Sequence, residues 1–188
     1  MTPAPVDHDE RRARLTEVLL DVVADGGLEA ATIRTVAERA GVSIGTVQHY
    51  FKTKDEMLQH AYRTVGEDLG NRAEERAEGA GSWKEAIREI MLELLPLDAR
   101  RMKAMRVSIA FAVRAMFVPE LGAELRKDLK ELQDIFVDML QQAGVPDAER
   151  EATTLLALNA GLAEPLIYGD GTPEQVVAAL DAYLDRVL

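Results

Sequence analysis

The sequence predicts an all-α fold of about nine helices with no strands, beginning with a three-helix helix-turn-helix domain. Apolar residues recur at intervals of three and four along almost the whole chain, which is the period of an amphipathic helix. The alternating apolar and polar pattern of a half-buried strand does not occur. Glycine, proline and short hydroxyl residues stand where the helical pattern stops, and they mark the ends of the predicted helices.

The first predicted helix carries one apolar stripe and stops at Gly26 and Gly27. Glycine readily adopts the left-handed conformation that ends many helices, so this pair predicts a helix end. The apolar residues follow the spacing of a single helix face: Leu15, Val18, Leu19, Val22 and Val23. We expect this stripe to cover the core of the hairpin that follows.

Two short helices set at an angle are predicted in the stretch TIRTVAERAGVSIGTVQHYFKTK, residues 32–54. The hydroxyl groups of Thr32 and Ser43 are expected to cap them, because a short side-chain oxygen accepts a hydrogen bond from an amide at a helix start. Gly41 interrupts the apolar pattern at the turn. The shared core is predicted to hold Val36, Ala37, Ala40, Val42, Val47 and Phe51. This is the pattern of a helix-turn-helix, and the alternative is a plain helical hairpin, because an AxxxGV turn occurs in many helical proteins.

The outward residues of the second helix suit a DNA major groove. They are small or hydrogen-bonding and carry no net charge: Ile44, Gly45, Thr46, Gln48 and His49. Glutamine and threonine side chains pair with base edges, and an isoleucine or a threonine methyl group can touch the methyl of thymine. The sequence therefore predicts that this helix reads bases.

A fourth helix is predicted to begin at once, because Thr53-Lys54-Asp55-Glu56 has the spacing of a capping box, and to run through Leu69. Lys54 then stands at the first helical position beside Tyr50 and His49. Charge, hydroxyl and backbone amides together can hold a DNA phosphate there. For Lys54 alone, a solvated surface lysine is an equally good interpretation.

Turn and cap residues divide the rest of the chain into five further predicted helices. Ser82 is expected to cap residues 83–95, Pro96 interrupts, and further helices are expected at residues 98–116 and 119–142. The segment 144–147 predicts a turn with Asp147 as the cap of a helix through Ile167. Thr172-Pro173-Glu174-Gln175 predicts a capping box at the start of the last helix.

Composition narrows the class of protein. With 188 residues, 47% of them apolar and 29% charged, the chain is typical of a globular protein. The absence of cysteine excludes disulfides, thiol catalysis and thiolate metal sites. We find no targeting segment, no apolar run long enough to span a bilayer, no metal-ligand motif, no phosphate loop and no nucleophile elbow. We therefore expect a cytoplasmic protein that is not an enzyme and holds no metal or cofactor.

The net charge of −11 is unusual for a protein that binds nucleic acid, but the charge is unevenly distributed. Residues 1–64 hold 8 Lys or Arg against 10 Asp or Glu, whereas residues 65–188 hold 14 against 23. Most of the excess negative charge therefore lies outside the predicted helix-turn-helix domain. The basic residues available to line its DNA side are Arg11, Arg12, Arg14, Arg34, Lys52 and Lys54.

The middle and last helices suggest a pocket and a subunit interface. Methionines and aromatics concentrate in the middle helices, and their adaptable side chains suit an irregular cavity, although ordinary core is the alternative. The candidate pocket residues are Trp83, Met91, Leu95, Met102, Met105, Arg106, Ile109, Phe117, Asn159 and Leu162. The last two helices offer more apolar surface than one hairpin buries on one side, which predicts a four-helix bundle in a dimer, with intramolecular core as the alternative. The candidate interface residues are Leu155, Leu156, Leu162, Ala163, Leu166, Val176, Leu180, Tyr183 and Leu184.

The N-terminal third resembles the DNA-binding domain of the TetR family of bacterial transcriptional repressors, through the spacing of GVS, HYF and the lysine before the fourth helix. The stretch RMKAMRVSIAFAVRAMFVPEL is similar to the C-terminal domain of BetI-type repressors. The sequence departs from the family pattern at Thr35, where an acidic residue is common, and at Gln48, where Leu or Tyr is common. The resemblance, with the outward residues above, implies these DNA contacts: Thr32, Arg34, Ser43, Ile44, Gly45, Thr46, Gln48, His49, Tyr50 and Lys54.

The resemblance also implies a division of labour. Residues 1–54 are expected to form the DNA-binding domain, and residues 55–188 a helical ligand-binding and dimerisation domain. The expected protein is a homodimeric repressor that binds a palindromic double-stranded DNA operator and is released by an unknown small-molecule effector, without a membrane partner. A helical protein-interaction protein and a transcriptional activator are the alternatives.

Overall fold

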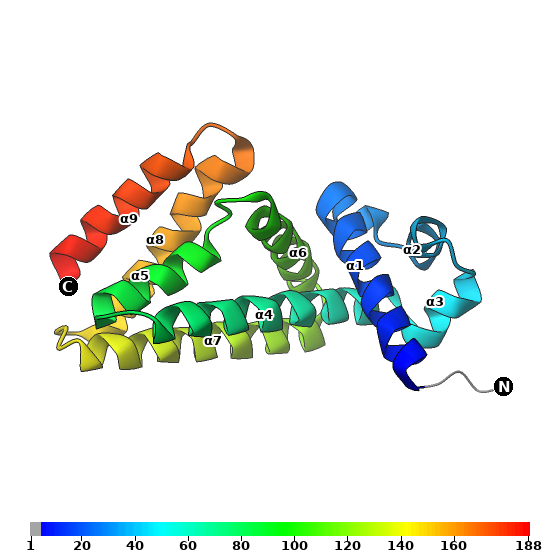
Figure 1. Cartoon of the computed structure of the whole chain (residues 1–188), viewed down its shortest axis with the longest axis horizontal. Helices are drawn as coiled ribbons and strands as arrows, with labels where there is room; N and C mark the ends of the chain where they lie inside the picture. The colour runs from blue at the N-terminus through cyan, green and yellow to red at the C-terminus, as the bar shows by residue number, and fades with distance from the viewer. Residues whose placement is uncertain (1–4) are drawn as a thin grey trace. The chain divides into compact units, whose positions relative to one another are not determined.

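The structure of the protein, a computed structural model, describes the backbone of residues 5–188 and the side chains from residue 10 onward. The described chain forms nine α-helices and no strand, as Figure 1 shows, which confirms the all-α prediction. The helices are α1 (Pro5–Ala30), α2 (Ile33–Ala40), α3 (Ile44–Tyr50), α4 (Lys54–Glu78), α5 (Trp83–Leu94), α6 (Ala99–Ala115), α7 (Pro119–Gln142), α8 (Ala148–Tyr168) and α9 (Pro173–Val187).

The chain divides into two compact units. Unit 1 comprises Met1–Gly66 and Arg106–Leu121, and unit 2 comprises Glu67–Met105 and Gly122–Leu188. The helices α4 and α6 each contribute residues to both units. Unit 1 is therefore larger than the expected DNA-binding domain of residues 1–54, and the functional boundary at residue 54 stays a prediction.

In unit 1, the apolar face of α1 packs on the hairpin of α2 and α3. Side chains from all three helices are almost fully buried, among them Leu19, Val36 and Val47, and Phe51 closes the core after α3. The helical backbone stops at Gly27 as predicted, because Gly27 has φ 66° and ψ −163°. A short helical segment follows as far as Ala30, so α1 consists of two helices joined at a kink.

The predicted caps of the hairpin are confirmed. Thr32 Oγ1 and Ser43 Oγ each accept a hydrogen bond, at 3.0 Å, from the backbone N–H three residues later. Gly41 ends α2 with a left-handed φ of 67°. At the start of α4, Thr53 Oγ1 accepts from the N–H of Glu56 at 3.0 Å, but the Glu56 carboxylate accepts from the N–H of Lys52 and not from that of Thr53. The capping box is therefore displaced by one residue.

The C-terminal part of α6 is tied to the N-terminal part of α4 within unit 1. The guanidinium of Arg114 donates to both carboxylate oxygens of Asp55, at 2.7 and 2.9 Å. The ring of Tyr62 stacks on that of Phe111, with centroids 4.0 Å apart. These contacts fix the start of α4, where Lys54 stands.

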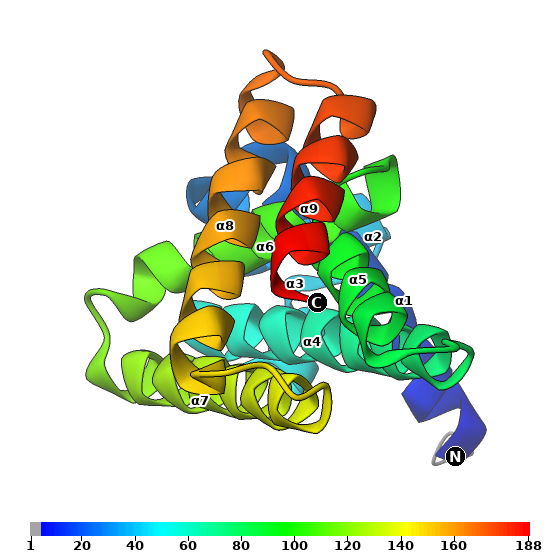
Figure 2. The ribbon, with the colours of Figure 1, turned by 90° about the vertical axis from the view of Figure 1, so that its left-hand side faces the viewer.

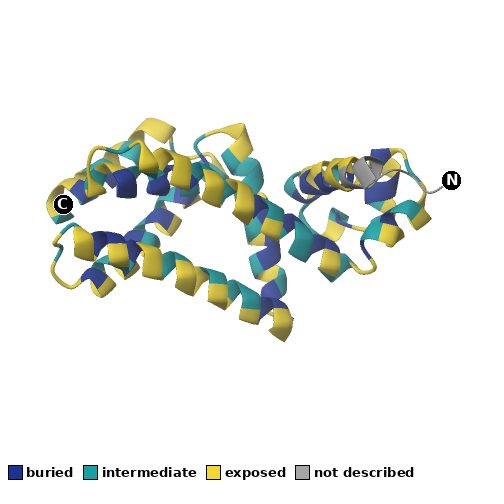
Figure 3. Cartoon of the chain, turned by 60° about the horizontal axis from the view of Figure 1, so that its bottom comes forward, coloured by how far each residue is buried: buried dark blue, intermediate teal, exposed yellow. Residues whose placement is uncertain are grey.

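The core of unit 2 is built from the C-terminal half of α4 together with α5, α7, α8 and α9. Figure 2 shows α8 and α9 as an antiparallel hairpin with α5 beside α9, and the buried residues form stripes on the inward faces in Figure 3. The larger buried side chains are Ile87, Met91, Leu95, Phe136, Leu140, Leu155, Leu180 and Leu184. The one buried amide, Asn159, donates to the carbonyl oxygen of Met91 at 3.0 Å, so α8 is hydrogen-bonded to the last turns of α5.

A buried ion cluster joins three helices of unit 2. The side chain of Glu93, near the end of α5, is only 2% exposed, and it pairs with Arg72 and Arg76 from α4. Arg101 from α6 lies 3.8 Å from Glu93 and also donates to the carbonyl oxygen of Leu92 at 2.7 Å. Burial opposes the charged form of Arg72, but the hydrogen bonds and charges of Glu93 and Asp68 together outweigh it and raise the pKa of Arg72. We call Glu93 with these three arginines the Glu93 cluster.

The helix ends of unit 2 agree with the sequence except at α8. Ser82 caps α5, and Thr172 with Gln175 forms the predicted capping box of α9. The prediction that Asp147 caps α8 is wrong. Asp147 adopts a left-handed φ of 56° and makes no capping hydrogen bond, and its carboxylate pairs with Arg150 at 2.7 Å instead.

Candidate nucleic-acid interface and ligand cavity

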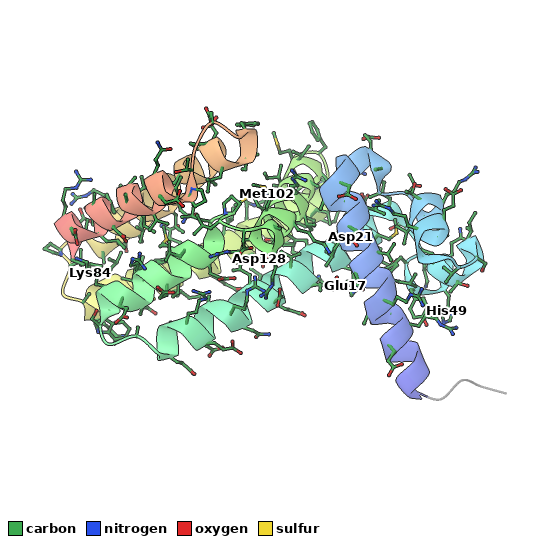
Figure 4. The ribbon with its side chains drawn as sticks, turned by 45° about the horizontal axis from the view of Figure 1, so that its top comes forward. Glu17, Asp21, His49, Lys84, Met102 and Asp128 are labelled. Atoms are coloured by element: carbon green, nitrogen blue, oxygen red, sulfur yellow. The ribbon has the colours of Figure 1, made fainter. Side chains whose placement is uncertain are left out.

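The helix α3 presents an exposed face of the composition that the sequence predicts. The side chain of Val47 is buried beneath it, whereas Ile44 is 48% exposed. Gln48 and His49 are also exposed, and Figure 4 places His49 on α3. Thr46 is half-buried, and its hydroxyl lies 2.8 Å from the Ser43 hydroxyl at the helix start. The face therefore offers an amide, an imidazole and an apolar side chain.

Lys54 occupies the first position of α4, close in sequence to the end of α3. Its ammonium group forms no hydrogen bond or ion pair with any other residue in the described part of the chain, and the side chain is half-buried. Next to it, the hydrogen bonds from Arg114 lower the pKa of the Asp55 carboxyl, helped by the charges of Arg114 and Lys54 and against the effect of burial. Tyr50 and His49 meet edge to face with ring centroids 5.3 Å apart. The structure thus brings the phenol, the imidazole and the helix start into one short segment.

The predicted contacts on α2 are placed differently. Thr32 is exposed, and its hydroxyl caps α2 while lying 2.8 Å from the hydroxyl of Thr35. Arg34 forms an exposed pair with Glu38 one turn later, at 2.8 Å. Such an exposed pair contributes little to stability, so a phosphate can replace Glu38 at small cost.

The second basic feature of unit 1 is a hollow of about 470 Å³ between α1 and the turn before α3. Arg11 and Arg14 line it from α1, and Gly41, Ser43 and Thr46 line it from the turn and α3. Two of the basic residues picked out in the sequence therefore lie beside the start of the predicted reading helix.

Unit 2 contains a cavity of about 990 Å³ between α4, α5 and α7. The helix α4 supplies Glu67, Leu69, Gly70, Asn71, Ala73, Glu74, Ala77 and Glu78. The helices α5 and α7 supply Trp83, Ala86, Ile90, Leu94, Leu132, Ile135 and Met139. Its volume lies at the upper end of the range, roughly 300–1,000 Å³, that is usual for sites of drug-sized ligands.

Only Trp83, among the ten pocket residues predicted from the sequence, lines this cavity. Met91, on another face of α5, and Leu95, which follows the end of α5, are fully buried, whereas the cavity faces Trp83, Ala86, Ile90 and Leu94. The other predicted pocket residues are not among its lining residues: Met102, Met105, Arg106, Ile109, Phe117, Asn159 and Leu162. Phe117 is 74% exposed. Arg106 instead donates to the carbonyl oxygen of Ala24 on α1, within unit 1.

The interface predicted on α8 and α9 is only partly exposed. Five of its residues are buried in the core of unit 2, as the intramolecular alternative holds: Leu155, Ala163, Val176, Leu180 and Leu184. Four are half-buried: Leu156, Leu162, Leu166 and Tyr183. Burial and a hydrogen bond to Glu151 raise the pKa of Tyr183 to about 12, so this phenol stays protonated.

Sequence reasoning missed a set of small exposed residues on these two helices. On α8 they are Ala157, Ala160 and Gly161, and on α9 they are Ala178, Ala179 and Ala182. They recur at helical spacing, and that spacing was the available signal.

The described residues contain neither a membrane-spanning helix nor a cluster of metal-ligating side chains. No helix there combines the length and the apolar character needed to cross a membrane. Within the same residues, no group of three or more histidine and acidic side chains is arranged to hold a metal ion.

Two family profiles match the chain. The profile of the BetI-type transcriptional repressor C-terminal domain matches residues 83–188. The profile of the bacterial regulatory proteins of the tetR family matches residues 15–61, which include the helix-turn-helix.

Individual proteins give the same result. The HTH-type transcriptional regulator BetI 1 of Chromohalobacter salexigens is 34% identical over 154 residues, covering 81% of this chain and 76% of that protein. A solved transcriptional regulator from Rhodococcus sp. Rha1 is 42% identical, with a TM-score of 0.86 and coverage of 94% of this chain and 95% of that one. A regulator from Saccharomonospora viridis, solved in complex with choline, shares the fold with a TM-score of 0.88 at 19% identity, over 94% of this chain and 96% of that one.

These relatives are transcriptional regulators. The profile matched over residues 83–188 covers more than half of the chain, and the helix-turn-helix geometry agrees with the N-terminal match. The chain belongs to the TetR family of bacterial regulatory proteins, with a C-terminal domain of the BetI type, and it is a DNA-binding transcriptional regulator.

Proposed function

We propose that this regulator is a repressor that binds a two-fold symmetric operator as a homodimer and releases it when a small molecule occupies the cavity of unit 2. The observation that carries the proposal is the exposed, uncharged face of α3 next to Lys54 at the start of α4, whose ammonium group forms no hydrogen bond or ion pair within the described residues. A recognition helix needs such a face to reach base edges, and the lysine fixes its position on the phosphate backbone.

Selection of bound sites from random duplex DNA with the purified protein tests whether the helix-turn-helix recognises a DNA sequence. We expect an enriched palindrome whose half-sites lie about one helical turn, or a multiple of it, apart. The result follows from two identical reading helices related by a two-fold axis. An enriched motif without symmetry would contradict the dimer, and no enriched motif at all would favour a helical protein that binds other proteins.

The small exposed residues of α8 and α9 support the dimer. Side chains as small as alanine and glycine let helices of two subunits approach closely, and the half-buried Leu156, Leu162 and Leu166 supply apolar surface beside them. A closed two-fold interface uses the same patch on both subunits, so a hairpin of two helices from each forms a four-helix bundle. We therefore place the subunit interface on the exposed face of this hairpin.

Replacing Ala160 by arginine is expected to convert the dimer to a monomer at micromolar concentration, because it puts two bulky charges into the symmetric contact. We expect a dissociation constant raised by at least about tenfold, the effect of roughly 1.4 kcal/mol. Light scattering after size exclusion measures the change. Ala123→Arg, at an exposed position of α7, is the matched control and is expected to leave the dimer intact. Equal dimer fractions in the two variants would contradict an interface on this face.

The path from cavity to DNA follows α4. This single helix begins at Lys54 and carries eight of the residues that line the cavity, from Glu67 to Glu78. A ligand that prefers one conformation of this helix by a few kcal/mol shifts the equilibrium of the whole protein by the same amount. Because the choline complex is that of a relative only 19% identical, its ligand supports the presence of an effector but not its identity.

A further inference from the structure

We infer that the cavity of unit 2 selects an organic cation with a large apolar body, considerably larger than choline. The inference rests on the proposed effector role of the same cavity and adds the chemical class of the ligand. Three features of the cavity carry it: the segregation of charge on α4, the apolar walls, and the tryptophan at its side.

Charge on α4 is divided between two faces of the helix. Arg72 and Arg76 are turned toward α5, where they pair with Glu93 and, for Arg76, with Glu89 at 2.9 Å. The cavity instead receives Glu67, Glu74 and Glu78, which follow one helix face together with Asn71. None of these three carboxylates has a hydrogen bond or ion pair with another residue in the described part of the chain.

The described lining contains no lysine, arginine or histidine that could neutralise these carboxylates. The local potential is therefore negative, which favours a cation and disfavours an anion of the same shape. The carboxylates are exposed, so the preference is moderate and falls as salt is added.

The remaining lining sets the size and polarity of the ligand. From α4 the cavity receives the small residues Gly70, Ala73 and Ala77 beside Leu69. The apolar walls are formed by Ile90, Leu94, Leu132, Ile135 and Met139. A cavity of about 990 Å³ with such walls gains affinity from apolar area removed from water. Choline, a trimethylammonium group joined to a two-carbon alcohol, is too small to cover much of this apolar area.

Trp83 adds a specific contact for the cation. Its side chain is 42% exposed and lines the cavity at the first position of α5. The face of an indole attracts a cation that lies within about 6 Å of the ring. Trp83 is also the single tryptophan of the chain, so the protein carries its own fluorescent reporter in this cavity.

Two ions of nearly equal size and shape and opposite charge test the inference on the full-length protein. We expect tetraphenylphosphonium to change the Trp83 fluorescence saturably, and tetraphenylborate to bind at least about tenfold more weakly, as charge selection over a few ångströms predicts. Choline is expected to bind more weakly than tetraphenylphosphonium. Equal binding of the two tetraphenyl ions, no saturable binding of tetraphenylphosphonium, or tighter binding of choline would overturn the inference.

A pair of neighbouring substitutions separates the cavity from the overall negative charge of the protein. Glu74→Gln and Glu75→Gln remove the same charge from adjacent exposed residues of α4, but only Glu74 lines the cavity. We expect Glu74→Gln to weaken tetraphenylphosphonium binding about threefold to tenfold and Glu75→Gln to leave it within about twofold. Equal effects of the two would show a nonspecific attraction and contradict the site.

Operator release is measured separately, by fluorescence anisotropy of the labelled selected DNA. Charge-selective binding of tetraphenylphosphonium that leaves operator affinity unchanged would uphold the cation site and refute the effector role of the cavity. Release of the operator by tetraphenylborate and tetraphenylphosphonium alike would uphold the effector role and refute the selection of cations.

Discussion

Replacing Lys54 by alanine is expected to weaken operator binding by about a hundredfold. A hydrogen bond to a charged group contributes roughly 1.5 kcal/mol, and a dimer loses one such contact in each half-site. Lys54 already stands at the first turn of α4, where backbone amides and the helix dipole favour an anion, so its loss leaves the phosphate with weaker partners. The salt dependence of binding is expected to fall by about two released ions per dimer.

Fluorescence anisotropy with the selected operator, repeated at several salt concentrations, measures both effects. Lys127→Ala, which removes the same positive charge from an exposed side chain of α7, is the control for net charge. Full affinity in Lys54→Ala would remove the main support for the proposed DNA contact.

Gln48→Ala is expected to behave differently, because an exposed amide on α3 reads a base. The substitution should relax the base preference at one position of the site and leave the salt dependence of binding unchanged.

Replacing Glu93 by alanine is expected to lower the free energy of unfolding by about 3–5 kcal/mol, the usual cost of removing one partner from a buried ion pair. The loss is large because Arg72 and Arg101, whose side chains are only 13% and 16% exposed, would keep their charges without the buried carboxylate. An alanine also leaves a void between α4, α5 and α6. Urea unfolding followed by far-UV circular dichroism gives the free energy.

The control for this prediction is Glu89→Gln, one turn earlier on α5. Glu89 also pairs with Arg76, but its side chain is 24% exposed and solvent screens the pair, so the expected loss is within about 1 kcal/mol. If Glu93→Ala lowered the free energy of unfolding no more than Glu89→Gln does, burial would not explain the contribution of the Glu93 cluster to stability.

The helix boundaries were the part of the fold most accessible from sequence. The structure begins α7 at Pro119 and ends it at Gln142, as the sequence predicts. The hydroxyl caps of α2, α3, α5 and α9 act locally, so the neighbouring residues suffice to predict these helix starts. Asp147 shows the limit of such local rules. A carboxylate three residues before Arg150 can pair with the guanidinium instead of capping, and the left-handed backbone at Asp147 favours that outcome.

The cavity was beyond the reach of the sequence pattern because α5 is apolar over much of its circumference. Trp83, Ile90 and Leu94 follow one side of the helix, and Met91 and Leu95 follow another. Which side faces a cavity depends on how α4, α7 and α8 pack against α5, and these are long-range contacts. The same reason explains why Leu155 and Leu180 proved to be core, whereas small residues such as Ala160 and Ala179 are exposed on α8 and α9.

The Glu93 cluster bears on where a fragment of this protein can be cut and still fold by itself. A fragment that begins at residue 83, where the BetI-type profile begins, retains Glu93 and Arg101 but loses Arg72 and Arg76. This fragment also lacks the residues that α4 contributes to the hydrophobic core, including Ala73. The smallest autonomous C-terminal piece therefore has to start before Arg72, so the segment between the two family profiles is an integral part of that piece and no mere connection.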